Sequence, residues 1–386
     1  MKSLSMYFLY GAAMASTVLA LVTPRVLADK RAVVDDLPSD GVISNGVAFG
    51  FLPSDGYKVA SPAYTIAQIN SKLGGKASTY GWYAQISSST FYGSQLLERL
   101  DEVVASGAVF QPAVMPTIPL SEVTSSVASQ VASVLEQFTG RGVEVWLRFG
   151  HEMNYYVADG TYHGTATEFI TAWKNVHAAV STNPKIKMFW SPNDDTPNTP
   201  IAPYWPGPSY VDIVGVDCYP TSSPLSPSAF SSCYKDFYNT YSDANIPFAI
   251  GETGYAGSSG NAAWLSQLVN QDMCEYPNYI AASWFEYNKE ENYLIVEGSS
   301  SILSSTQQLL LNNTKKGCDS AGGTVTSSLS TAVEAMPTTL ATKTSTIATT
   351  KAASETGSCT WGCNGWDCSA SSPCNSNFTC MSGYCH

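Results

Sequence analysis

Histidine is scarce in this chain, with four residues in 386, one of them at the C-terminus. So few histidines leave little for a Ser-His-Asp triad, and no Gly-x-Ser-x-Gly turn presents a serine nucleophile. His151-Glu152 matches half of a zinc motif, but the second histidine would stand where Tyr155 is. His163 and His177 lack ligand-like spacing. The sequence therefore predicts no metal and no other cofactor.

Charge is also sparse. Asp, Glu, Lys and Arg make up 13% of the residues, and the net charge is −12. A nucleic-acid partner favours a basic surface, so this balance argues against one. Aromatic residues make up 12% of the chain, and rings with few charges suit neutral sugars, although rings also fill cores.

Beyond the N-terminus, no apolar run reaches the roughly 18 residues that a membrane span needs. Residues 1–28 contain Lys2, an apolar stretch and the ending Val26-Leu27-Ala28, which together predict a secretory signal peptide. Residues 29–44 are then a pro-segment removed after Lys30-Arg31, or an N-terminal extension with an ordinary charged flank. We expect a secreted, extracellular monomer with no membrane partner.

Ten cysteines in a secreted chain predict disulfides rather than free thiols. Four precede residue 320 and permit three pairings, of which we favour Cys218–Cys233 and Cys274–Cys318. Residues 320–358 contain 18 Ser or Thr and no Phe, Tyr or Trp. Such a segment cannot build a core, so it predicts a disordered Ser/Thr-rich linker.

The remaining six cysteines lie in the last 28 residues. Residues 359–386 are too few for a core of their own, so disulfides must hold this module together. It carries more aromatic surface than it can bury, in Trp361, Trp366, Phe378 and Tyr384. Exposed rings on a small scaffold favour binding to insoluble polysaccharide, and the alternative is an inert or protein-binding knot. Enzyme, linker and Cys-rich module in this order resemble fungal secreted hydrolases with a cellulose-binding module.

Strand-like and helix-like runs alternate upstream of the linker. The expected strands are nearly continuous apolar runs, typical of parallel strands covered on both faces: Gly46–Pro53, Ser78–Ile86, Ala108–Pro116, Val143–Phe149, Lys187–Ser191, Val211–Cys218, Pro247–Gly251 and Tyr279–Phe285. The expected helices are Tyr64–Leu73, Ser94–Ala105, Leu120–Phe138, Thr165–Val180, Ser226–Tyr241, Asn261–Cys274 and Ser304–Leu311. Residues 194–210 are rich in Pro and lack helical periodicity. The pattern predicts a (β/α)8 TIM barrel over residues 45–319.

Two glutamates end apolar strands of this barrel. Glu152 follows the run to Phe149, and Glu252 follows the run to Ile250. Catalytic residues of such barrels lie at the C-terminal strand ends. Cleavage of a glycosidic bond with retention needs an acid and a nucleophilic carboxylate about 5–5.5 Å apart. Two strand-end carboxyls therefore favour sugar chemistry.

Arg148 lies four residues before Glu152, and strand alternation would put Arg148, Gly150 and Glu152 on one face. A guanidinium there would favour an ionised nucleophile. The alternative is that Arg148 closes the core by pairing with a structural carboxylate.

The run Arg148-x-x-His151-Glu152-Met153-Asn154 resembles glycoside hydrolase family 26, within the clan A retaining glycosidases. Val211 to Asp217 is similar to the sixth strand of that family, and the resemblance covers roughly residues 45–300. It implies Glu152 as acid/base and Glu252 as nucleophile. Family mannanases usually have a Trp-rich segment after the motif, whereas Tyr155-Tyr156-Val157 stands here. Mannan is the first expected substrate and β-glucan the next.

Further polar residues near these strand ends are candidates for sugar binding. His151 binds a hydroxyl, orients the nucleophile or lines the barrel, and Asn154 binds a hydroxyl or caps the loop. Asp217, followed by Tyr219, binds sugar or supports Arg148. Trp82 with Tyr83, Trp190 and Trp284 either stack on sugar rings or fill the core. Glu286 is a reserve catalytic carboxyl.

These features together predict a secreted retaining endo-β-glycosidase that acts on a cell-wall polysaccharide by double displacement. One alternative is a non-catalytic polysaccharide-binding barrel, a lectin or effector. The other is an inverting enzyme that uses Glu286 as the partner carboxyl.

Overall fold

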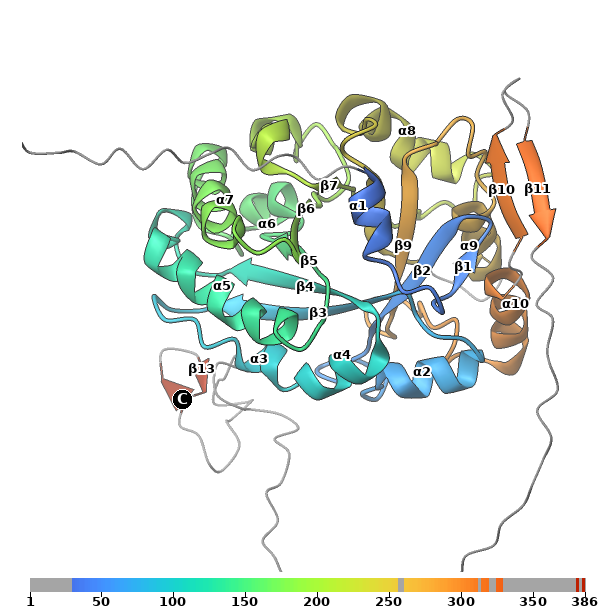
Figure 1. Ribbon diagram of the computed structural model, residues 1–386, viewed down its shortest axis with the longest axis horizontal. Coiled ribbons are helices and arrows are strands. Elements are labelled where there is room, and N and C mark those ends of the chain that lie inside the picture. Colours follow the sequence, from blue (N-terminus) through green and yellow to red (C-terminus); the bar gives the residue numbers. More distant parts are fainter. Residues whose placement is uncertain are drawn as a thin grey trace, which may run out of the picture.

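The computed structural model describes residues 30–255 and 260–311, with the backbone of residues 314–318, 324–328, 380–381 and 384–385. Eight parallel strands follow one another around a sheet that closes because the first pairs with the last (Figure 1). The predicted (β/α)8 barrel is confirmed. The strands are β2 (Val47–Pro53), β3 (Thr79–Ile86), β4 (Val109–Pro116), β5 (Val145–Phe149), β6 (Ile186–Trp190), β7 (Ile213–Val214), β8 (Phe248–Thr253) and β9 (Tyr279–Glu286).

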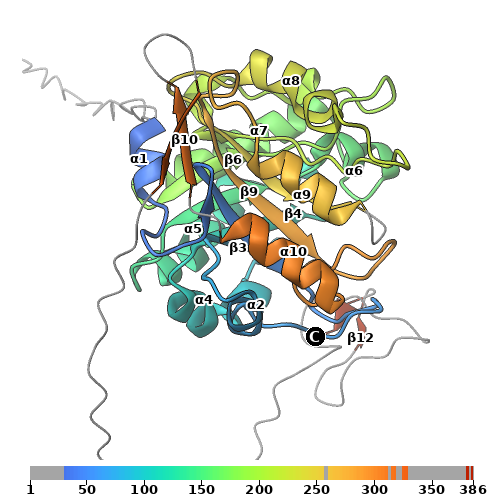
Figure 2. The same cartoon turned by 90° about the vertical axis from the view of Figure 1, so that its right-hand side faces the viewer.

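Helices surround the sheet, and Figure 2 shows α10 between α2 and α9 on the side of the barrel. The helices are α1 (Lys30–Asp35), α2 (Ile66–Leu73), α3 (Ser94–Leu97), α4 (Leu100–Ser106), α5 (Ser125–Thr139), α6 (Met153–Asp159), α7 (Ala166–Val180), α8 (Ala229–Tyr241), α9 (Asn261–Val269) and α10 (Ser300–Leu310). The single helix expected over Ser94–Ala105 is two helices, α3 and α4. The segment after β6 forms only the 3-10 turns η2 (Ala202–Tyr204) and η3 (Pro208–Tyr210), in agreement with its missing periodicity.

Local capping explains where several helices begin. Thr165 accepts the backbone N–H of Glu168 while the Glu168 side chain accepts that of Thr165, and this reciprocal box starts α7. The Thr124 side chain caps α5 without a reciprocal partner. α5 therefore starts five residues later than expected, after the 3-10 turn η1 (Leu120–Glu122). Ser299 likewise starts α10 four residues earlier than expected.

The buried apolar side chains of the described residues form three clusters. A large layer lies between the strands and the helices, and a smaller one fills the barrel near the N-terminal strand ends. The smaller layer consists of Val33, Ala48, Val109, Trp146, Phe189, Ile213, Ala249, Ile280 and Ala281. At the opposite, C-terminal ends of the strands, a third cluster of Leu52, Phe285 and Tyr287 has Tyr83 and Tyr219 packed against it.

The N-terminal segment closes the base of the barrel. Val33 is fully buried in the smaller layer, and the Trp146 indole donates to Asp36 over 3.0 Å. Lys187 forms a 3.7 Å ion pair with the same carboxylate. β1 (Ile43–Ser44) adds an antiparallel strand to β2. The part of the expected pro-segment or extension that starts at Val33 thus belongs to the barrel.

Cys218 and Cys233 form the predicted disulfide, which ties the segment after β7 to α8. Cys274 is also disulfide-bonded, and its predicted pairing with Cys318 stays a prediction. β10 (Thr314–Cys318) pairs with β11 (Thr324–Ser328), so the start of the predicted linker contains a strand. β12 (Cys380–Met381) pairs with β13 (Tyr384–Cys385).

Several expectations fall on residues that the structure does not describe. These are the signal peptide, the rest of the linker, and the side chains of Trp361, Trp366, Phe378 and Tyr384. Within the described residues, no helix has both the length and the apolar character that a membrane span requires.

Candidate active site

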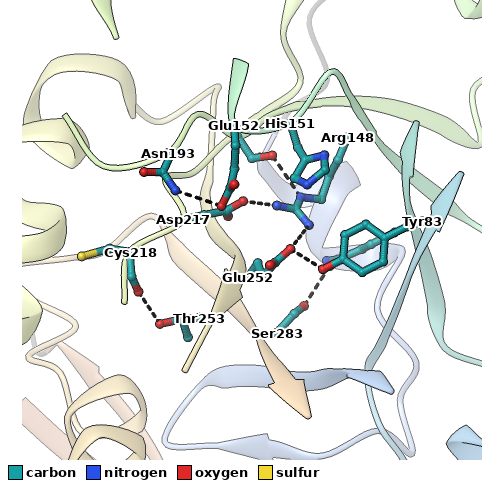
Figure 3. Close-up of polar contacts among 12 residues, drawn as sticks. Tyr83, Arg148, His151, Glu152, Asn193, Asp217, Cys218, Glu252, Thr253 and Ser283 are labelled. Carbon is teal, nitrogen blue, oxygen red and sulfur yellow. Dashed lines mark hydrogen bonds and ion pairs between the residues drawn. The ribbon is translucent and has the colours of Figure 1, made fainter. Parts of the chain in front are cut away.

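Glu252, at the C-terminal end of β8, is the most heavily hydrogen-bonded carboxylate at the mouth (Figure 3). The Tyr83 hydroxyl donates to its Oε2 over 2.6 Å, and the Tyr219 hydroxyl donates to its Oε1 over 2.7 Å. An Arg148 guanidinium N–H also donates to Oε2, over 3.2 Å. Three donors to an ionised carboxylate both stabilise the charge and fix its orientation.

Arg148 extends from β5 and links three of the surrounding elements. It is fully buried, donates to the Ser191 hydroxyl over 3.0 Å and forms an ion pair with Asp217 as well as with Glu252. Burial alone would lower the pKa of Arg148, but the charges of Asp217 and Glu252 outweigh burial and raise it. Arg148 is therefore a permanent cation that both supports the core through Asp217 and contacts Glu252, so the two alternatives expected for it coexist.

Glu152 reaches the site by a route that strand alternation does not describe. β5 ends at Phe149, and the backbone then turns through left-handed conformations at Gly150 (φ 55°) and Glu152 (φ 51°). The expectation that Arg148, Gly150 and Glu152 share one regular strand face is wrong. A left-handed glutamate is strained, and such strain concentrates at functional sites.

The Glu152 carboxyl accepts a hydrogen bond from the Asn193 side chain over 3.0 Å. Glu152 is only 7% exposed. Burial, followed by the charge of Glu252, raises the pKa of Glu152 from 4.5 to about 7. The two carboxyls are equally buried but differ in their partners: Glu252 accepts three hydrogen bonds and Glu152 accepts one, from an amide. An acid and a nucleophile in one site require such different environments.

Asn154 serves the loop after β6 rather than the open site. Its amide donates to the carbonyls of Asn193 and Thr199, each over 2.9 Å, and its oxygen accepts the Asn193 N–H over 2.8 Å. Of the two roles expected for Asn154, this geometry matches loop capping. Through that loop Asn154 positions Asn193, and so the amide that contacts Glu152.

His151 and Asp217 each have a buried polar atom without a hydrogen-bond partner among the described residues. These atoms are Nδ1 of His151 and Oδ1 of Asp217. Burial and the charge of Arg148 lower the pKa of His151 well below its usual range, so the imidazole is neutral. Burial raises the pKa of Asp217, and Arg148 opposes that rise. Buried atoms of this kind call for a partner, such as a hydroxyl of a bound ligand.

The three tryptophans expected to stack on sugars do not line the mouth. Trp190 and Trp284 have no exposed surface, and Trp82 is 7% exposed with the Arg99 guanidinium 4.1 Å from its ring. All three belong to the layer between strands and helices. A ring covered in this way cannot stack on a sugar, so these residues are core residues.

Glu286 also faces away from the mouth. It is fully buried and accepts backbone N–H groups of Ile295, Val296 and Glu297 at 2.7–3.1 Å. These hydrogen bonds tie its carboxyl to the following loop. The expectation of Glu286 as a reserve catalytic carboxyl, or as the partner in an inverting mechanism, is wrong because it does not reach the site.

Sequence reasoning missed two contacts of the site and misread a third. Ser191 and Asn193 lie just beyond β6, and the sequence analysis gave neither of them a role. Tyr83 stood out only as a ring beside Trp82, whereas its hydroxyl binds Glu252. Alternation along β3 was the available signal, since Tyr83 and Trp82 must face opposite sides. Within the described residues, no group of three or more His, Cys, Asp or Glu side chains is arranged to hold a metal ion.

Comparison with known proteins identifies the family of this chain. The sequence profile of glycosyl hydrolase family 26 matches residues 76–309, which contain both strand-end glutamates. Endoglucanase H of Acetivibrio thermocellus is 26% identical over 188 residues, or 45% of this chain and 21% of that protein. A mannan endo-1,4-beta-mannosidase of Bacillus subtilis strain 168 is 26% identical over 187 residues, or 46% of this chain and 48% of that protein. The chain thus spans less than half the length of these two relatives.

Solved structures share the fold at lower identity. A GH26 beta-mannanase from Bacteroides ovatus superposes with a TM-score of 0.50 at 13% identity, over 74% of this chain and 90% of that one. A modular endo-beta-1,4-mannanase from Cellulomonas fimi gives a TM-score of 0.50 at 15% identity, over 74% and 76%. Likeness at this level concerns the barrel alone.

Proposed function

Because the chain belongs to glycosyl hydrolase family 26, we propose that it is a retaining endo-β-glycosidase that hydrolyses a cell-wall polysaccharide. β-Mannan is the first candidate substrate, since one relative is named a mannan endo-1,4-beta-mannosidase. β-Glucan is the second, since another is named an endoglucanase. The observation that carries the proposal is the pair Glu152 and Glu252, two strand-end carboxyls with different partners at one barrel mouth.

In the first step, Glu252 attacks the anomeric carbon and Glu152 gives its proton to the departing glycosidic oxygen. The bond between sugar and carboxylate forms as the glycosidic bond breaks, and the released chain end carries the proton. Tyr83, Tyr219 and Arg148 hold the Glu252 carboxylate aligned before attack. Glu152, with a pKa of about 7, is protonated below neutral pH and suits the acid role.

In the second step, Glu152 takes a proton from water, and the hydroxide so formed displaces Glu252 from the sugar. The charge of Glu252 raises the pKa of Glu152, and that charge disappears when the ester forms. The pKa of Glu152 therefore falls as the intermediate forms, which converts the acid into a base. The displaced Glu252 then regains its charge, and Glu152 is again protonated for the next cycle.

His151 and Asp217 are our candidates for contacts with sugar hydroxyls. Neutral His151 can donate or accept at Nδ1, and Asp217 can accept at Oδ1, the two atoms left without partners. Tyr219 acts on the substrate through Glu252 in this scheme.

Product profiling on mannan, mixed-linkage β-glucan and xylan tests the proposal. We expect shortened internal fragments from one of the three polymers, a retained anomer in proton NMR of the first product, and no turnover by Glu252→Ala. An inverted first anomer would reject Glu252 as nucleophile. Binding to a polymer without release of reducing sugar would favour the alternative, a lectin or effector.

Secretion and anchoring complete the proposal. A signal peptide over residues 1–28 would export the protein, and the module at 359–386 would hold it on insoluble polysaccharide. Co-sedimentation of the full chain with insoluble polysaccharide, compared with Trp361→Ala and Trp366→Ala, tests the anchoring. Equal sedimentation of the variants and the wild type would argue that the module is an inert or protein-binding knot.

A further inference from the structure

The C-terminal end of β9 directs alternate side chains to opposite sides. Phe285 packs at the mouth with Tyr219 and Tyr293, whereas Trp284 and Glu286 face outward. Both outward side chains bind the loop that follows β9, residues 287–297. The loop is thus attached to its own strand at two points.

The first point is the Trp284 indole, which donates to the Tyr293 carbonyl over 2.7 Å. The second is the Glu286 carboxyl, whose Oε1 accepts three consecutive N–H groups, from Ile295, Val296 and Glu297, at 3.1, 2.9 and 2.7 Å. Glu286 has no exposed surface, so water cannot replace these bonds without the loop opening. Together the two attachments fix the backbone on both sides of Leu294.

Tyr293 leads from this loop to the candidate nucleophile. Its ring centroid lies 5.4 Å from that of Tyr219, at an interplanar angle of 61°. Gly254 permits this packing, because an added β-carbon there would stand 2.7 Å from Tyr293 and 3.3 Å from Tyr219. The Tyr219 hydroxyl in turn donates to Glu252. A continuous line of contacts therefore runs from β9 through the loop to the carboxylate.

We propose that Trp284 and Glu286 form a clamp that holds Tyr293 against Tyr219 and thereby positions the carboxylate of Glu252. Both are positioning residues, since neither touches the site. The clamp deepens the proposed function and rests on it for the role of Glu252. Its effect should fall on the chemical step, because a misplaced nucleophile loses alignment while the remaining sugar contacts persist.

Hydrogen exchange tests the clamp without any turnover. In the full chain, the amides of Ile295, Val296 and Glu297 should be protected, and Glu286→Ala should release them while β8 and β9 stay protected. Glu286→Gln keeps an Oε1 acceptor and should retain most of the protection. If the three amides exchange equally fast in the wild type and in Glu286→Ala, the clamp is absent.

Kinetics test its effect on Glu252, with the polysaccharide that the wild type cleaves as probe. We expect Glu286→Ala to lower kcat about tenfold with KM changed less than about threefold, Glu286→Gln to recover most of kcat, and Tyr293→Ala to match Glu286→Ala. The double variant Glu286→Ala/Tyr293→Ala should lose little more than either single variant, because both act along one line of contacts. The positioning role would be overturned if the kcat losses of the two single variants multiplied in the double variant. An unchanged kcat in folded Glu286→Ala would also overturn it.

The outcomes separate the two proposals. A wild type without activity on any polymer rejects the proposed function, and the exchange data still decide whether the clamp holds the loop. An active wild type whose kcat does not respond to Glu286→Ala rejects the positioning role alone.

Discussion

The hydroxyl of Tyr83 lies 2.6 Å from Oε2 of Glu252, the oxygen that also accepts a hydrogen bond from Arg148. Tyr83 comes from β3 and Glu252 from β8, so this bond crosses the mouth of the barrel. Burial, followed by the charge of Glu252, raises the pKa of Tyr83 well above its usual value, so the phenol stays protonated and can only donate to Oε2. Tyr83 is therefore a fixed donor to the candidate nucleophile.

We expect Tyr83→Phe to lower kcat by roughly 10- to 100-fold, because a hydrogen bond to a charged group contributes about 1.5–3 kcal/mol. Tyr219→Phe should have a similar effect, since it removes the donor to the other oxygen of Glu252. Steady-state kinetics on the preferred polymer measure both. The matched control is Tyr92→Phe, which removes a hydroxyl from a ring that is 67% exposed. Wild-type kcat in Tyr83→Phe would mean that this bond does not matter for catalysis.

The pH profile should carry the signature of Glu152. With a pKa of about 7, the acid loses its proton as pH rises, so kcat/KM should fall on the alkaline side with an apparent pKa near 7. Glu152→Gln cannot lose a proton there, so its lower rate should lack this alkaline limb. Substrates with good leaving groups need little protonation, and their first step should be much less affected. An unchanged alkaline limb in Glu152→Gln would assign the limb to another group.

Periodicity identified the barrel because its signal is local. Parallel strands covered on both faces read as apolar runs, and a glutamate at the end of such a run is visible without any tertiary knowledge. The barrel then brought Glu152 and Glu252 together. Both could be named as candidates from the sequence for this reason.

The direction of side chains was not readable in the same way. All residues of β9 are buried, so no polar alternation marks Phe285 as the residue at the mouth and Trp284 as part of the outer layer. The left-handed backbone at Glu152 has no signature either, since left-handed conformation favours glycine. Asn193 is positioned by Asn154, a contact across 39 residues that no local pattern contains.

Stability should fall as pH rises from acid to neutral because of buried carboxyls. Burial raises the pKa of Glu152 and of Glu286 from 4.5 to about 7, so the native state keeps protons that the unfolded state releases. Their contribution is full below about pH 4.5 and is lost as pH rises through about 7. At 1.36 kcal/mol for each pKa unit, each group changes the free energy of unfolding by up to about 3 kcal/mol.

Urea unfolding at pH 4.5, 6 and 7.5 measures this dependence. Glu152→Gln should be less sensitive to pH than the wild type over this range, because the glutamine has no proton to release. Glu136→Gln is the control, since Glu136 is an exposed residue of α5. An equal slope in Glu152→Gln and the wild type would contradict the assignment of the raised pKa to Glu152.

Gly251 lets Arg148 approach β8, because glycine has no β-carbon to block the guanidinium. An added β-carbon at position 251 would lie 2.5 Å from Nε and 2.9 Å from Cζ of Arg148. The guanidinium is fully buried and bonded to Ser191, Asp217 and Glu252, so it cannot move aside without breaking those bonds. We expect Gly251→Ala to reduce the free energy of unfolding by about 1–3 kcal/mol and to lower kcat, because Arg148 supports Glu252.

Gly75→Ala is the matched comparison. Its added β-carbon would also meet side-chain atoms, 2.8 Å from a methyl group of Leu311 and 2.9 Å from a methyl group of Val42. Leu311 is 39% exposed and can move, whereas Val42 is buried, so the change should also cost stability. Neither side chain belongs to the candidate site, so kcat should stay unchanged. Urea unfolding and steady-state kinetics on both variants measure the difference. An equal loss of kcat in the two variants would show that any crowded glycine has this effect, rather than the contact with Arg148.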